Sequence, residues 1–115
     1  MLKKENRIAG KRNFNQIYRK GKVLKKGIVQ IRALEIPGNS IQFAAVVPLA
    51  VSKKSTARNK LRREIYRIGK GLISKEIIRT GFRIVVSLKA NPENHDLGKE
   101  IPDILYKLGC LKKLP

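Results

Sequence analysis

Alternating apolar and polar side chains mark the strands that this chain is expected to form. Residues 22–36 alternate over much of their length, which predicts a strand with one buried face, and an interruption at Gly27 fits the same pattern. A Pro-Gly-Asn turn leads into a returning strand at residues 41–51, where Pro48 implies a sheet edge or a bulge. The mostly apolar run 82–88 predicts a further strand at the centre of the sheet.

Two shorter segments, one near each end of the chain, have helical spacing. Asn13 is a suitable N-cap for a helix that runs to about Arg19 and stops at Gly21. Apolar residues recur every three or four positions over residues 97–108, which predicts a final amphipathic helix with Pro102 near its first turn.

The main helix is expected to begin at an N-cap provided by Ser55 or Thr56. Gly69 and Gly71 weaken its middle, which predicts a break there and a resumed helix over residues 74–79. Its apolar residues recur at helical offsets and form a stripe that must face a core: Leu61, Ile65, Ile68 and Leu72.

The expected order is helix, strand, strand, helix, strand, helix, with room for one extra short strand. This order predicts an α+β fold with a mixed sheet. A chain of 115 residues can bury one modest core, and neither a linker nor an internal repeat divides it. We therefore expect residues 1–115 to form a single domain.

Positive charge dominates the first three-quarters of the chain. Lys and Arg number 27 against 8 Asp and Glu, a formal net charge of +19. Residues 1–89 hold 23 basic and 4 acidic side chains, whereas residues 90–115 hold 4 of each. The basic residues concentrate in the runs 11–26 and 53–70. A small domain this basic repels itself unless a polyanion neutralises it, so the charge predicts a nucleic-acid partner.

Composition excludes several kinds of site. One cysteine, Cys110, and one histidine, His95, cannot form a disulfide framework, a multi-cysteine zinc site or a His-pair metal motif. We expect His95 at the surface and Cys110 in the interior. The acids form no carboxylate pair near the basic runs, so the protein alone is not expected to be catalytic. Neither a membrane-spanning run nor a secretory signal is present, which favours the cytoplasm and no membrane partner.

Basic residues at helical spacing open the main helix. Arg58 and Arg62 lie one turn apart. Guanidinium groups along a rigid helix can bind successive phosphates, and Glu64 is the only acid in this run. A merely solvated face would normally mix Glu with Lys, so the pattern favours contact with RNA or DNA. A second row on the same helix comprises Lys60, Arg63, Arg67 and Lys70.

Phe14 and Tyr18 share one face of the first helix and lie between basic residues. Aromatic rings beside cations can stack unpaired bases while the cations hold the backbone. Anchoring a short helix to the core is the commoner role of such a pair, and one ring can serve each purpose.

Three motifs, in order, resemble the protein component of bacterial ribonuclease P over about residues 6–111. The segment FNQIYRKG at 14–21 resembles the family's F-x-x-x-[YF]-x-x-G helix and turn. VSKK at 51–54 is similar to the end of its central strand, and ARNKLRREI at 57–65 resembles its basic helix, A-x-x-R-N-R-x-[KR]-R. The chain departs from the family in a shortened segment before the basic helix, in Lys60 for Arg, and in Pro48 for a common Gly.

The resemblance implies a ribosomal S5 domain 2-like fold, with a four-stranded mixed sheet in α-β-β-β-α-β-α order. It also implies a subunit that binds a catalytic RNA and the 5′ leader of precursor tRNA, and assists endonucleolytic removal of the leader. Mg²⁺ would be bound mainly by the RNA subunit. The implied leader-binding residues are Phe14, Tyr18 and Lys53. The implied contacts to the RNA subunit are Arg58, Asn59, Lys60, Arg62, Arg63 and Arg67.

The residue pattern leaves two other classes open. A small ribosomal protein that structures ribosomal RNA would be equally basic and non-catalytic, and a DNA-binding architectural protein would share the charge. Aromatic rings among the cations of the first helix favour a cleft for single-stranded RNA over both.

Overall fold

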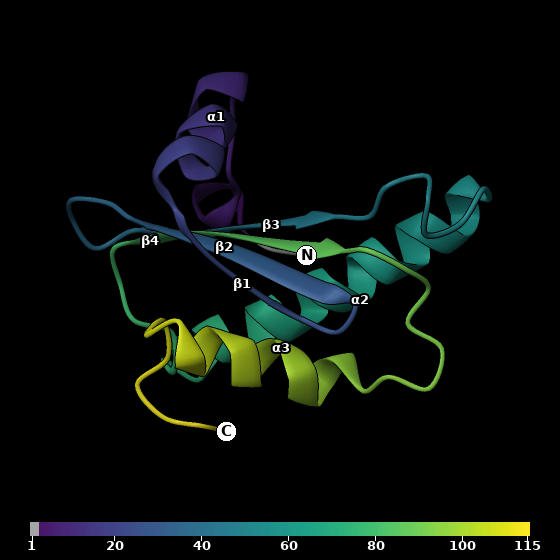
Figure 1. Ribbon diagram of the computed structural model, residues 1–115. Helices are drawn as coiled ribbons and strands as arrows, with labels where there is room; N and C mark the ends of the chain where they lie inside the picture. Colours follow the sequence, from purple (N-terminus) through teal and green to yellow (C-terminus); the bar gives the residue numbers. More distant parts are fainter. Residues whose placement is uncertain (1–2) are drawn as a thin grey trace.

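A four-stranded β-sheet lies at the centre of the protein, with α1 on one face and α2 and α3 on the other (Figure 1). The computed structural model describes residues 3–115. The α-β-β-β-α-β-α order follows a short 3-10 turn and confirms the α+β class. The elements are η1 (Lys4–Asn6), α1 (Lys11–Lys20), β1 (Lys22–Lys26), β2 (Val29–Glu35), β3 (Ile41–Val46), α2 (Ser55–Ser74), β4 (Phe82–Leu88) and α3 (Leu97–Lys107).

β4 occupies the centre of the sheet, as its apolar sequence predicts. The strand order is β1-β2-β4-β3. β2 pairs antiparallel with both β1 and β4, whereas β3 pairs parallel with β4, so the sheet is mixed. The parallel pair is connected through α2, since two parallel strands need a long crossover. Residues 84–88 of β4 are all buried.

The strands before α2 confirm the expected interruption at Gly27 and differ from the prediction in where β3 ends. Gly27 divides the stretch 22–36 into β1 and β2, and its φ of +61° is the left-handed conformation that glycine adopts easily. Because the stretch forms two strands instead of one, it accounts for the extra short strand that the sequence allowed. β3 ends at Val46 rather than at residue 51. Pro48 therefore lies in the loop after an edge strand, where its missing N–H removes no hydrogen bond from the sheet.

α1 begins earlier than predicted and ends where predicted. Gly10 occupies the N-cap position, and Asn13 lies within the helix, where its side-chain amide donates to the carbonyl oxygen of Ala9 at 2.7 Å. Gly21 follows the last residue of the helix. A Cβ at Gly21 would lie 2.5 Å from the carbonyl oxygen of Ile17, so a side chain has no room where the chain turns from α1 into β1.

α2 runs without interruption through the predicted break. Gly69 is buried against the ring of Phe43, and a Cβ at this position would lie 2.9 Å from two of the ring atoms. The glycine therefore permits a close approach between helix and sheet. Gly71 is tolerated because packing on one side of the helix outweighs its weak helix propensity.

Both ends of α2 also correct the prediction. Lys54 occupies the N-cap position, one residue before the first of the two predicted caps, so Ser55 is already helical. The predicted continuation over residues 74–79 does not form, because Ile78 leaves the helix and forms an isolated bridge with Leu111 near the C-terminus.

The sheet separates two hydrophobic clusters. The larger cluster lies between the sheet and the helices α2 and α3, and it includes the predicted stripe of α2. Ile65 and Leu72 are buried there, and Leu61 and Ile68 pack against them. The smaller cluster lies between the sheet and α1, and its buried residues are Ile8, Ile17, Ala44 and Val85.

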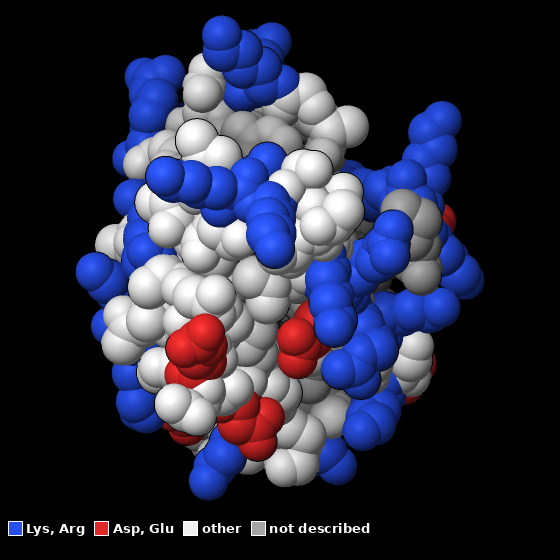
Figure 2. All heavy atoms as spheres, turned by 90° about the vertical axis from the view of Figure 1, so that its right-hand side faces the viewer, with Lys and Arg blue, Asp and Glu red and all other residues white. Residues whose placement is uncertain are grey.

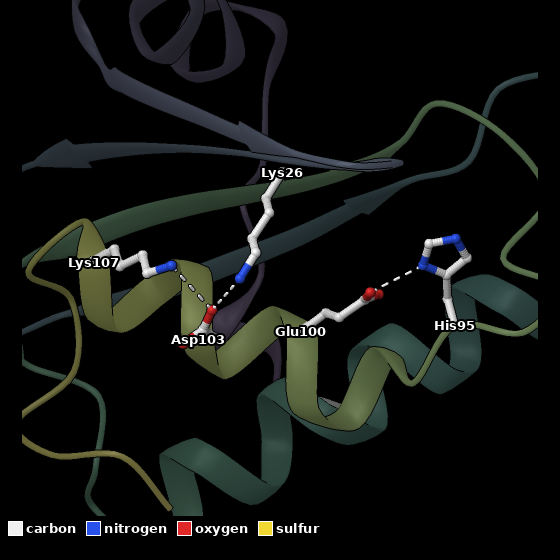
Figure 3. A network of polar contacts seen from close by, with 5 residues as sticks. All are labelled: Lys26, His95, Glu100, Asp103 and Lys107. Carbon is white, nitrogen blue, oxygen red and sulfur yellow. Dashed lines mark hydrogen bonds and ion pairs between the residues drawn. The ribbon is translucent and has the colours of Figure 1, made fainter.

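Charged side chains join the β1–β2 hairpin to α3 (Figure 3). Nζ of Lys26 lies 2.9 Å from Oδ2 of Asp103, and Nζ of Lys107 lies 3.4 Å from the same oxygen. The hydrogen bond between Lys26 and Asp103 lowers the pKa of the carboxyl and raises the pKa of the amine. Near the start of α3, Nδ1 of the exposed His95 lies 2.9 Å from Oε1 of Glu100.

Candidate nucleic-acid interface

The side of α2 that faces away from the core carries cations at three- and four-residue spacing. Because the apolar stripe is held against the sheet, the intervening residues are directed outward. Figure 2 shows Lys and Arg side chains over much of this view, most densely along the right-hand flank, with acidic side chains mainly in the lower left and lower centre. We define the basic α2 surface as the residues that line a hollow of about 670 Å³: Asn59, Arg62, Arg63, Tyr66, Arg67 and Lys70.

Among residues 3–115, no ion pair neutralises the positive charge of this surface. No Lys or Arg of α2 forms an ion pair with another residue in the described range 3–115. Asp103 and Glu100 pair instead with side chains around α3. Four cations that converge on one hollow without a carboxylate create a field that attracts a polyanion. The geometry therefore favours phosphate groups as the ligands of α2.

The structure distinguishes among the six residues predicted to contact an RNA subunit. Four line the hollow, whereas Lys60 is exposed elsewhere on α2. Arg58 is half-buried, and its Nη1 donates to the carbonyl oxygen of Ser52 at 2.8 Å, so it ties the helix to the preceding loop. Nη2 of Arg62 donates to Oδ1 of Asn59 within the hollow itself.

Tyr66 was not identified from the sequence. It lies one turn beyond Arg62 and Arg63, and its ring meets that of Phe43 edge to face, with the centroids 6.1 Å apart. The contact with the buried Phe43 holds the Tyr66 ring in the lining of the hollow, together with the cations. In the sequence, Tyr66 lies four residues after Arg62, and this spacing could have placed it on the same side of the helix as the cations. Lys70 belonged to the second predicted row and also lies in the hollow.

Phe14 and Tyr18 have different environments although they share a face of α1. Phe14 is half-buried and packs against the small cluster that includes Ile17 and Val85. Tyr18 is 45% exposed, and the guanidinium carbon of Arg32 lies 4.9 Å from the centre of its ring. Phe14 therefore anchors the helix, while Tyr18 is accessible and has a cation against its ring. Arg32 was missed, although strand alternation places it on the same face as Leu34.

Lys53 lies in the segment 47–54, between β3 and α2. This segment is at the right-hand end of the sheet in Figure 1, whereas α1 stands over its left-hand part. Lys53 is exposed, and the amide of the next residue, Lys54, donates to Oγ of Ser52 at 3.3 Å. The role of Lys53 in binding a leader stays a prediction.

The part of the chain that the structure describes offers no group of three His, Cys, Asp or Glu side chains that could hold a metal ion. Cys110 is buried, as predicted, and burial raises the pKa of its thiol to about 11, so the reactive thiolate is disfavoured. None of the helices within residues 3–115 combines the length and the apolar character needed to cross a bilayer.

Comparison with known proteins gives a consistent result. The model of the ribonuclease P family matches residues 2–109. The chain belongs to this family. A ribonuclease P protein component from Pseudanabaena sp. is 27% identical over 115 residues and aligns over 96% of this chain and 97% of its own length. One from Rippkaea orientalis is 32% identical over 97 residues, covering 78% of this chain and 73% of the relative.

Solved structures agree with the family assignment. The ribonuclease P protein of Thermotoga maritima superposes with a TM-score of 0.64 at 27% identity, over 83% of this chain and 79% of that protein. The Staphylococcus aureus protein reaches 0.75 over 98% and 97% of the two chains, and its 19% identity supports the fold alone. Membership of the ribonuclease P family associates the chain with a tRNA-processing ribonucleoprotein, and therefore with an RNA partner.

Proposed function

We propose that this chain is the RNA-binding subunit of a ribonuclease P that removes the 5′ leader of precursor tRNA. In this proposal the basic α2 surface binds the catalytic RNA subunit, and the α1 side of the sheet binds the leader. The observation that carries it is the arrangement of two cation-bearing surfaces on opposite faces of one sheet. One surface is a rigid row of cations, and the other presents an exposed aromatic ring.

The two surfaces suit different RNA ligands. Guanidinium groups on a helix have fixed spacing and can each bind a phosphate through two hydrogen bonds, which suits folded RNA with a regular backbone. An exposed tyrosine beside an arginine suits an unpaired strand, whose bases can stack on the ring. A subunit that binds both would hold the leader in a defined position relative to the catalytic RNA.

Catalysis is assigned to the RNA in this proposal. The described residues do not fit a magnesium site of their own, because their carboxylates are not grouped at either basic surface. Mg²⁺ is then bound mainly by the RNA subunit, and the protein contributes binding and orientation.

The test is reconstitution of the full chain with its cognate RNA subunit and a precursor tRNA at low Mg²⁺ concentration. The protein alone is expected to leave the precursor intact, and the RNA with protein is expected to cleave it at the 5′ end faster than the RNA alone. Robust cleavage by RNA-free protein, after contaminating nucleases have been excluded, would overturn the proposal. So would a protein that leaves the rate of the RNA subunit unchanged.

A further inference from the structure

One row of side chains crosses the sheet beside α1. The strand register pairs Lys25 of β1 with Gln30 of β2, Gln30 with Ser87 of β4, and Ser87 with Val46 of β3. Directly opposed residues on neighbouring strands have Cβ atoms about 4.5–5.5 Å apart, so their side chains can bind one ligand together. We call these four residues the floor row.

The floor row faces α1 rather than the main core. Val29 and Ile31, which flank Gln30, are buried in the cluster under α2 and α3, so Gln30 is directed to the opposite face. Val46 packs against the small cluster that Phe14 also contacts. α1 stands over the left-hand part of the sheet in Figure 1, and the strand ends that carry the floor row extend to its right.

Two polar members of the row lack partners within the described residues 3–115. Gln30 is half-buried and Ser87 is only 8% exposed, yet neither side chain forms a hydrogen bond with another residue in that range. Gln42 shows the contrast on the same face, because its Oε1 accepts a hydrogen bond from Nε of Arg83 at 2.7 Å. Neither group is among the fully buried unpaired atoms of the described residues, so the amide and the hydroxyl still reach solvent and can bind a ligand in place of water.

We propose that Gln30 and Ser87 bind the edge of one leader nucleobase, and that Lys25 binds a phosphate beside it. The inference rests on the proposed leader binding and names its site. An amide presents a donor next to an acceptor, which matches the paired donors and acceptors along the edges of unpaired bases. Two residues further along β2, Arg32 contacts the ring of Tyr18. A neighbouring leader base can therefore stack on Tyr18 while the first base binds Gln30 and Ser87 in the floor row.

The experiment measures precursor tRNA affinity for the reconstituted holoenzyme, with a single abasic nucleotide moved along the leader. With the wild-type protein, the abasic substitution at one position should weaken binding about tenfold or more, because a bidentate base contact is lost. With Gln30→Ala this penalty should largely disappear at that position and remain at the others. If the amide contacts that base directly, removing the base costs little once the amide is already absent. Ser87→Ala should reduce the same penalty in part.

Two further variants make the result specific. Gln42→Ala removes an amide on the same face that is already bonded to Arg83, and it should retain every abasic penalty. Lys25→Ala should weaken all leaders alike. If Gln30→Ala retains the full penalty at every position, or if Gln42→Ala removes it equally, the floor row does not bind a base. If the wild-type holoenzyme binds precursor and mature tRNA equally, leader binding itself fails, which is a separate outcome.

Discussion

At the scale of single residues, Phe14 and Tyr18 show how burial divides two aromatic side chains with the same spacing. Both could be placed on one face of α1 from the sequence, because they lie four residues apart. Which ring is covered depends on how the helix is inclined to the sheet, which the sequence pattern does not specify. Phe14 contacts the small cluster, whereas Tyr18 extends beyond it to Arg32.

This division predicts opposite effects of two alanine substitutions. Tyr18→Ala should weaken precursor tRNA binding by ~1–3 kcal/mol through loss of base stacking, with little change in mature tRNA binding. Phe14→Ala should instead reduce the free energy of unfolding by roughly 2–4 kcal/mol, since it empties part of the small cluster. Filter binding to both tRNA forms, with thermal unfolding followed by circular dichroism, measures the two effects. Equal weakening of mature and precursor binding by a folded Tyr18→Ala protein would contradict the leader assignment.

At the scale of elements, features that depend on residue spacing within one segment were predicted well, whereas contacts between distant segments were not. The stripe of α2, the central strand and the cations of the basic α2 surface all follow from spacing within one segment. The continuity of α2 does not, because it depends on the ring of Phe43, which comes from a different strand and lies against Gly69. The N-caps of α1 and α2 were also misplaced: Gly10 and Lys54 occupy the cap positions, and neither helix start has a side-chain capping hydrogen bond.

The two glycines of α2 provide a matched test of this interpretation. Gly71→Ala meets no atom within 4 Å and should stabilise the protein by up to about 1 kcal/mol through helix propensity. Gly69→Ala gains the same propensity, but its Cβ would lie 2.9 Å from a fully buried ring, and overpacking costs about 1–3 kcal/mol. The net effect should be destabilising. Urea unfolding of both variants measures the difference, and similar stabilisation by both would mean that Phe43 moves freely.

At the scale of the whole molecule, the fold places the charged segments on different surfaces, whereas the sequence shows only how many charges each segment carries. The balanced C-terminal quarter could be recognised from composition, and it includes α3, where the carboxylate of Asp103 pairs with both Lys26 and Lys107. The sequence did not indicate that α1 and α2 lie on opposite faces of the sheet. That arrangement follows from strand pairing between distant segments, and it converts two basic runs into two separate surfaces.

The separation predicts a localised dependence of RNA binding on salt. If the basic α2 surface and its neighbours contact 6–10 phosphates, affinity for the RNA subunit should fall about 10³–10⁵-fold between 50 and 200 mM salt, because condensed counterions are released. Arg62→Ala and Arg63→Ala should each lower the magnitude of the salt slope by about one. Lys99→Ala removes the same charge from α3 and should leave the slope unchanged, because α3 lies outside the basic α2 surface. Titrations of labelled RNA subunit at several salt concentrations compare the three variants. An equal reduction by Lys99→Ala would mean that RNA responds to the net charge of the protein rather than to the row of cations on α2.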